Sequence, residues 1–158
     1  MKQTTASSLL AALNAEQLSL LNFVTLLERE QEMLIANQSD QLHELSDQKT
    51  TASLVLNELS EKRRALLQEC VPQLDAESVR AWLKMQCAAG APVWQQIIAL
   101  AKRSKQLNNT NGELIQMKLR HNQQSLAALF NAAKKANLYG PNGRPAVSPG
   151  SGRSLGNG

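Results

Sequence analysis

The spacing of apolar residues divides the chain into helical segments. Between about residues 5 and 36, apolar residues recur every three or four positions and fill one arc of a helix turning 100° per residue. Three more apolar residues fall outside that arc and form a thinner second stripe: Leu18, Leu26 and Met33. We interpret the second stripe as the contact with a further helix of the same chain.

A second long helix is predicted from about Gln41 to Val71, where a seam of residues recurs at spacings of three and four. Two cations, Lys49 and Arg63, interrupt this otherwise apolar seam. We expect their aliphatic stems to lie along the seam while their charges reach solvent, where the acidic residues of this half of the chain are available. A short polar break precedes the helix and Pro72 ends it, so the first two helices should form an antiparallel hairpin.

A short helix and a very long one are predicted to follow. Asp75 can cap a helix from Ala76 to about Ala88, and Gly90 suits its C-cap. One stripe then runs from residue 93 to residue 136, and it resumes in phase beyond the helix-weakening cluster at residues 108–112. We therefore predict a single helix over about residues 92–138, although the sequence leaves open whether the cluster is continuous helix or a hinge.

The predicted fold is all-α: an elongated antiparallel bundle of three long helices plus one short helix. Residues 1–138 are expected to form a helical domain, and residues 139–158 a flexible tail. The basis for the tail is that six of the eight glycines and three of the five prolines follow Tyr139.

Composition predicts where in the cell the protein works and argues against a metal site. The first eight residues are polar with no apolar stretch after them, and no run approaches the ~20 apolar residues of a membrane span. We expect a cytoplasmic protein that does not insert directly into a membrane. Cys70 and Cys87 lack a CxxC spacing or a nearby histidine pair, so we expect buried thiols and no metal.

Charge is distributed unevenly along the chain. Residues 1–77 hold six Lys or Arg against twelve Asp or Glu, whereas residues 78–158 hold eleven against one. The halves could fold against each other, or the basic half could face an acidic partner or nucleic acid. We prefer the first interpretation, and we expect no nucleic-acid binding because no aromatic residues interleave with the basic ones.

The sequence offers no arrangement suited to catalysis. We find no nucleophile with a base, no phosphate loop and no metal-ligand spacing, so we expect no enzyme activity and no cofactor. His43 and His121 should be surface residues, and Glu28, Glu30 and Glu32 should be solvated. The remaining function is binding of another protein through apolar helix surface, and self-association through the same surface is an open alternative.

Four features of the chain are considered together. They are a first helix reading LLNFVTLLEREQEMLI, the turn and second helix with Asp40, Leu42, Leu45, Lys49, Arg63, Leu66 and Leu67, an Asn-rich segment NNTNGELI, and the ending YGPNGRP. In this order they resemble the FlgN family of flagellar type III export chaperones. The resemblance spans roughly residues 5 to 145, and the order of these features supports it more than any one of them does.

The resemblance implies a cytoplasmic chaperone for hook-associated proteins, which holds their amphipathic C-terminal segment and delivers it to the export apparatus at the membrane. It also implies a partner-binding surface on Leu114, Ile115, Leu119, Leu126, Leu129 and Phe130, with Tyr139 where the family keeps a tyrosine proposed to meet the export gate. The alternative is a structural coiled-coil protein that only oligomerises.

Overall fold

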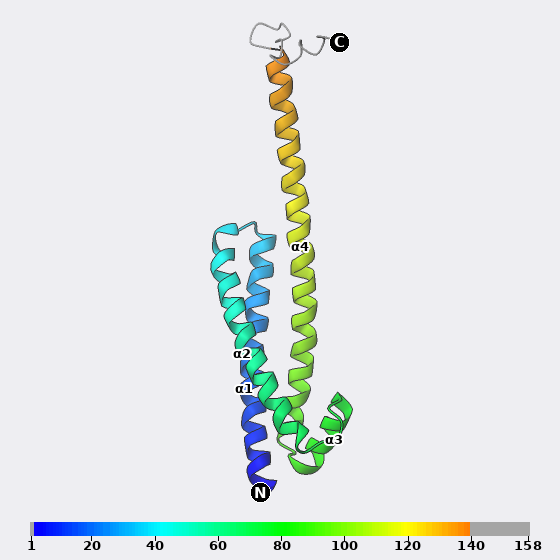
Figure 1. Ribbon diagram of the computed structural model, residues 1–158. Helices are drawn as coiled ribbons and strands as arrows, with labels where there is room; N and C mark the ends of the chain where they lie inside the picture. Colours follow the sequence, from blue (N-terminus) through cyan, green and yellow to red (C-terminus); the bar gives the residue numbers. More distant parts are fainter. Residues whose placement is uncertain (1, 140–158) are drawn as a thin grey trace, which may run out of the picture. The chain divides into compact units, whose positions relative to one another are not determined.

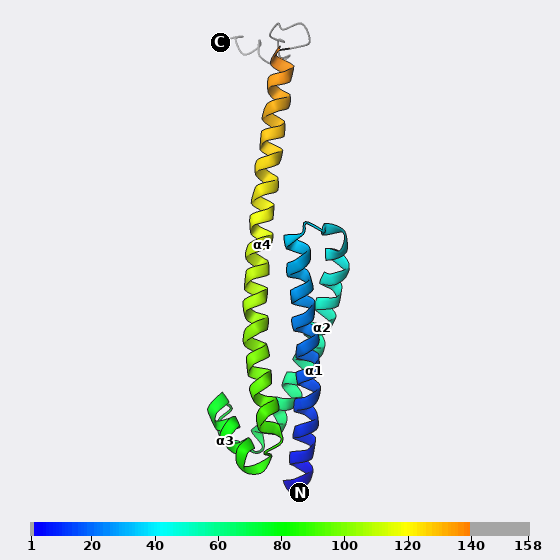
Figure 2. The same cartoon turned by 180° about the vertical axis from the view of Figure 1, so that it is seen from behind.

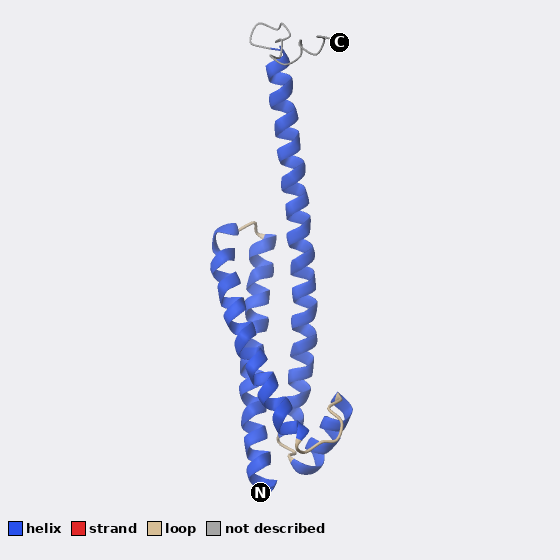
Figure 3. Ribbon diagram, viewed as in Figure 1, coloured by secondary structure: helices blue, strands red, loops and turns tan. Residues whose placement is uncertain are grey.

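The computed structural model describes residues 2–139, which are almost entirely helical (Figure 3). They contain four α-helices, one 3₁₀ turn and no strand: α1 (Lys2–Ile35), η1 (Ser39–Gln41), α2 (Leu42–Gln68), α3 (Ala76–Gln86) and α4 (Gly90–Tyr139) (Figure 1). The all-α fold class expected from the sequence is confirmed. The predicted tail, beyond Tyr139, lies outside the described residues.

The chain divides into two compact units, a first that reaches Leu114 and a second that begins at Ile115. In the first unit α1, α2 and the part of α4 up to Leu114 lie side by side, as the opposite views of Figures 1 and 2 agree. There α2 runs antiparallel to α1, and α4 runs parallel to α1. The predicted hairpin is confirmed, and the boundary between the units falls within one continuous helix.

The hairpin turn depends on the backbone of Asn37, which has a positive φ of 57°. Its N–H points to the carbonyl of Leu34 at 3.4 Å, and the next N–H, that of Gln38, donates to the carbonyl of Met33 at 2.9 Å. This pair of bonds is a Schellman motif, in which asparagine tolerates the left-handed conformation better than most side chains do. The turn therefore ends α1 and lets the chain reverse into α2.

Three clusters of buried apolar side chains hold the first unit together. The largest joins all four helices, with Leu13 of α1, Leu67 of α2, Leu83 of α3 and Ile97 of α4 among its members. A second cluster packs Leu26 and Met33 of α1 on α2, and a third packs Leu27 of α1 on Leu107 of α4. The second stripe of α1 thus meets another helix as expected, except that Leu18 is exposed.

The short helix α3 begins as predicted and ends differently. The carboxylate of Asp75 accepts hydrogen bonds from the N–H and the hydroxyl of Ser78, both at 2.8 Å, and these bonds lower the pKa of Asp75. The expectation that Gly90 caps α3 is wrong, because Gly90 is the first residue of α4. A Cβ at Gly90 would lie 3.2 Å from side-chain atoms of Leu13 and Leu83, so the absent side chain permits close packing.

The expectation that Lys49 and Arg63 raise their charges to solvent is wrong. The ammonium group of Lys49 donates to both carboxylate oxygens of Glu30, at 2.8 and 3.0 Å. The Nε atom of Arg63 lies 2.8 Å from Oε2 of Glu16, without the alignment of a hydrogen bond. Since Glu16 and Glu30 are buried on α1, these cations are drawn into the interface between α1 and α2, and Glu30 is not solvated as expected.

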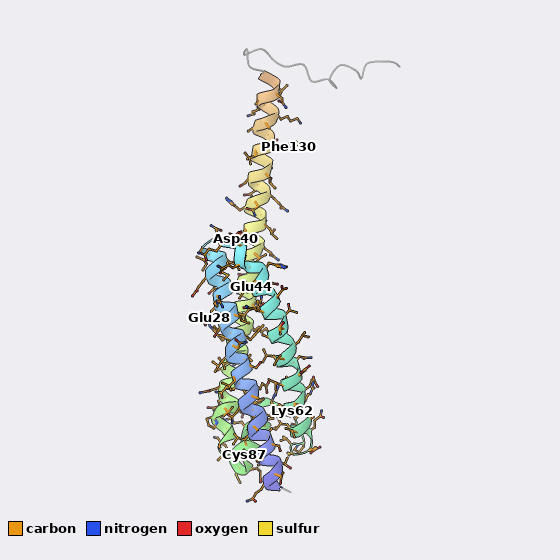
Figure 4. The ribbon with its side chains drawn as sticks, turned by 90° about the vertical axis from the view of Figure 1, so that its left-hand side faces the viewer. Glu28, Asp40, Glu44, Lys62, Cys87 and Phe130 are labelled. Atoms are coloured by element: carbon orange, nitrogen blue, oxygen red, sulfur yellow. The ribbon has the colours of Figure 1, made fainter. Side chains whose placement is uncertain are left out.

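The opposite charges of the two halves contribute little to the packing of the first unit. Among the ion pairs found there, Arg103 of α4 and Glu28 of α1 join the halves, at 3.6 Å and with exposed side chains. Glu28, which is labelled in Figure 4, belongs to the same helical hairpin as Asp40 and Glu44. Exposed pairs of this kind contribute little to stability. The two buried pairs instead lie within the acidic half.

Helix α1 is longer and more apolar than the sequence analysis allowed. Residues 3–35 meet the length and hydropathy of a membrane span, which corrects the statement that nothing approaches one. Leu9, Leu13 and Leu27 are nevertheless fully buried against other helices, and the same helix carries the buried Glu16 and Glu30. In this structure α1 is a core helix of the first unit.

Candidate functional site

The candidate binding surface lies on the part of α4 that belongs to the second unit. We define the exposed seam as Ile115, Leu119, Asn122, Leu126, Leu129 and Phe130. At 100° per residue, these positions fall within an arc of about 100° on one side of the helix. Its apolar members range from 40% exposed at Ile115 to 73% at Phe130, which is labelled in Figure 4. A row of large apolar side chains is thus open on a single helix face.

Residue choice explains why this segment is helical and amphipathic. From residue 115 to residue 138 the chain is rich in Leu, Ala, Gln, Lys and Arg, which favour helix, and it contains no Pro or Gly. Arg120, Gln124, Asn131 and Lys135 occupy the side opposite the exposed seam. Separation of apolar and polar faces is typical of a helix whose apolar side is meant to be covered.

The charged side chains of this segment are all basic. No Asp or Glu follows Glu113 in the chain, whereas residues 115–138 carry Lys118, Arg120, Lys134 and Lys135. A partner segment on the exposed seam would therefore meet a helix without negative charge, with Lys118 and Lys134 beside the apolar side chains.

The structure brings five of the seven predicted site residues together on the exposed seam. Leu114 is half-buried and belongs to the first unit, about 100° around the helix from Ile115. Tyr139 is the last residue of α4, and its side chain lies outside what the structure describes. The predicted continuity of the helix through residues 108–112 is confirmed, and this continuity keeps the seam in phase.

Sequence reasoning missed a buried polar junction on the same face of α4. Asn111 is 1% exposed, and its amide nitrogen donates to the carbonyl oxygen of Leu27 and to Oε1 of Glu30, each at 2.9 Å. Because Glu30 also accepts from Lys49, one carboxylate links α1, α2 and α4. The signal in the sequence was an asparagine at a stripe position, which had suggested only a weak helix.

A groove between α2 and α4 of the first unit was also not foreseen. Leu54, Ile98, Arg63 and Trp94 contribute to its lining. The guanidinium carbon of Arg63 lies 5.0 Å from the centre of the Trp94 ring, and this cation–π contact holds Arg63 beside Glu16. Burial raises the pKa of Glu16, with the charge of Arg63 opposing the shift.

The described residues contain no group of three or more His, Cys, Asp or Glu side chains that could hold a metal ion. His43 is exposed, with its Nε2 atom 3.8 Å from a carboxylate oxygen of Asp47, and His121 is exposed as well. Cys70 and Cys87 are free thiols, each half-buried beside the largest core cluster. What distinguishes the surface is an open apolar helix face, the feature of a helical protein-binding module.

Comparison with known proteins gives this class a family. A model of the FlgN protein family matches residues 1–146, so the chain belongs to the FlgN family and is a flagellum-related protein of that type. It is 31% identical over 144 residues to "Flagella synthesis protein FlgN" of Yersinia enterocolitica, an alignment that covers 89% of this chain and 92% of the relative. No solved structure matches the chain significantly.

Proposed function

We propose that this protein is a cytoplasmic export chaperone that acts by binding and has no catalytic activity. Its clients are the flagellar hook-associated proteins, whose amphipathic C-terminal segment it holds and delivers to the type III export apparatus at the membrane. The observation that carries the proposal is the exposed seam, an apolar helix face that is open on a chain of the FlgN family.

An amphipathic helix is the partner that this surface suits. Side chains of α4 at Ile115, Leu119, Leu126 and Leu129 follow one another at intervals of four, seven and three, which is the spacing of anchors between packed helices. Full burial of one such side chain stabilises a complex by ~1.5 to 3 kcal/mol. Covering several of them supplies enough free energy to order a client segment that is disordered when alone.

The first test replaces two anchors, Leu126→Gln together with Phe130→Gln. Glutamine is a good helix former, so the helix should persist while the apolar surface is lost. Isothermal titration calorimetry with the C-terminal segment of a hook-associated protein should show at least about a hundredfold loss of affinity. Circular dichroism should show unchanged helicity, because these side chains are 66% and 73% exposed.

A matched control removes apolar side chains from other faces of the same helix. Met117→Gln with Leu138→Gln deletes two exposed side chains that lie well away from the arc of the exposed seam. This variant should bind the client segment as the original protein does. Equal losses in the two variants would show that the effect is unspecific, and normal binding by the Leu126 and Phe130 variant would refute the proposed site.

The alternative function, oligomerisation without a client, uses the same observation. A helix with anchors at heptad spacing also suits a second copy of itself. Analytical ultracentrifugation of the original protein and the Leu126 and Phe130 variant separates the two functions. A chaperone keeps its mass and loses its client, whereas an oligomerising protein falls to a smaller species and never binds the client segment.

The delivery step is proposed for Tyr139, which follows the exposed seam at the end of α4. In a Tyr139→Ala variant, binding of the client segment should be unchanged, and export of hook-associated proteins from cells should fall. Loss of client binding in this variant would instead place Tyr139 in the client surface.

A further inference from the structure

The first unit contains an example of how this face of α4 is covered. Leu107 packs on Val24 and Leu27 of α1, and four residues later Asn111 donates to the carbonyl oxygen of Leu27 and to the carboxylate of Glu30. Helix α1 therefore covers the apolar residue of α4 with branched aliphatic side chains. It offers Asn111 a backbone carbonyl and a carboxylate.

The exposed seam repeats this composition. Asn122 stands among Leu119, Leu126 and Leu129 just as Asn111 stands among apolar positions of the same stripe. The two asparagines are eleven residues apart, about three helical turns, so they face nearly the same side of α4. A helix that covers the exposed seam with apolar side chains alone could offer the Asn122 amide a backbone carbonyl, as Leu27 does for Asn111, but not the second, charged acceptor that Glu30 supplies, and binding would be weaker.

We propose that the client segment is an acidic amphipathic helix that places an Asp or Glu carboxylate opposite Asn122, as α1 places Glu30 opposite Asn111. This inference rests on the proposed function and names the chemistry of its partner. The carboxylate sets the register of the client, because a single polar position in an apolar seam pairs well in one alignment only.

The charge of the second unit supports an acidic client. Lys118 and Lys134 lie beside the exposed seam, Arg120 and Lys135 lie on the opposite side of the helix, and no acidic residue follows Glu113. In the first unit Lys49 accompanies the Glu30 and Asn111 pair. In the second unit the basic residues of α4 itself would balance the carboxylate of the client.

The test uses four synthetic amphipathic peptides that have the same leucine seam and the same glutamates on their outer faces. They differ in one central seam residue, which is Glu, Gln, Leu or Lys. Fluorescence anisotropy measures their binding to the full chain. The Glu peptide should bind about tenfold more tightly than the Leu peptide, because the latter has no carboxylate to accept from the Asn122 amide, and the Lys peptide should bind most weakly.

The Asn122→Leu variant should reverse the preference, so that the Leu peptide binds more tightly than the Glu peptide. Gln124→Leu, which makes a similar replacement on the opposite face, should keep the original order. An order that is the same in the original protein and in the Asn122→Leu variant overturns the inference. So does a preference of the original protein for the Leu peptide.

A second arm tests the charge. Lys134→Glu, at the residue beside the exposed seam, should weaken binding of the Glu peptide and reduce its dependence on salt concentration. Unchanged affinity and salt dependence would refute an acidic client. The two failures can be told apart. The proposed function fails if the client segment of a hook-associated protein binds the original protein no better than it binds the Leu126 and Phe130 variant, and the peptide series does not enter that comparison.

Discussion

The two parts of α4 share one stripe and differ in what covers it. Up to Leu114, stripe positions such as Ile97, Leu107 and Asn111 are at most 4% exposed, because α1 and its neighbours pack on them. From Ile115 onward the same kind of position is open, and every described side chain from Leu119 to Leu138 is exposed. One pattern thus forms a core in the first unit and a surface in the second.

This contrast teaches that an apolar stripe specifies a face and not its partner. The first part of α4 obtains its partner within the chain, so its stripe contributes to folding. In the second part, the helix propensity of the residues and continuity with the first part maintain the helix. The apolar stripe is not needed for folding there and is available to another protein. Substitutions at equivalent positions of the two parts should therefore separate stability from binding.

The largest expected effect comes from truncating a leucine in each part. Leu107→Ala removes a side chain that is 2% exposed and should lower the free energy of unfolding by ~2 to 5 kcal/mol. Leu126→Ala, at a position 66% exposed, should change it by less than ~0.5 kcal/mol. Urea denaturation followed by circular dichroism measures the difference. A large loss in the Leu126 variant would mean that the exposed seam is part of a core.

A smaller effect is expected from the two asparagines. Asn111→Ala deletes the hydrogen bonds to the Leu27 carbonyl and to Glu30, and should cost ~1 to 3 kcal/mol of stability. Asn122→Ala removes an exposed amide and should leave the urea midpoint nearly unchanged. Equal stability of the two variants would contradict the role assigned to the Asn111 junction.

The helices were predictable because they depend on local spacing. The hairpin, the cap at Asp75 and the continuity of α4 follow from periodicity and capping residues that lie close together in the sequence. The end of α3 was misjudged at Gly90, whose small size serves contacts with Leu13 and Leu83. Those contacts join residues far apart in the sequence, and no local rule reveals them.

The buried charges were unpredictable for the same reason. Lys49 and Arg63 were recognised as cations in an apolar seam, but their partners Glu30 and Glu16 lie on another helix, in a register that the sequence does not display. The candidate surface was predictable as a set of helical positions. Which part of the stripe stays open became clear only once the burial of each position was known.

The last prediction concerns the pH dependence of the buried part. Burial raises the pKa of Glu16 above its ordinary value of 4.5, because the loss of hydration outweighs the attraction of Arg63. The native state then binds a proton more tightly than the unfolded state, so this contribution to stability is fully present below the unfolded pKa and is lost as pH rises through the folded pKa. Glu16→Gln, which mimics the protonated form at every pH, should lack this pH dependence.

Urea denaturation of the original protein and the Glu16→Gln variant at pH 4 and pH 7 measures the effect. The stability of the original protein relative to the variant should fall between the two pH values. We expect this change to be the smallest of the three, because Arg63, 2.8 Å from the carboxylate, offsets part of the cost of the charge. A rise in relative stability toward pH 7 would mean that the attraction of Arg63 outweighs the loss of hydration, and that the first unit gains stability from the charge that it buries.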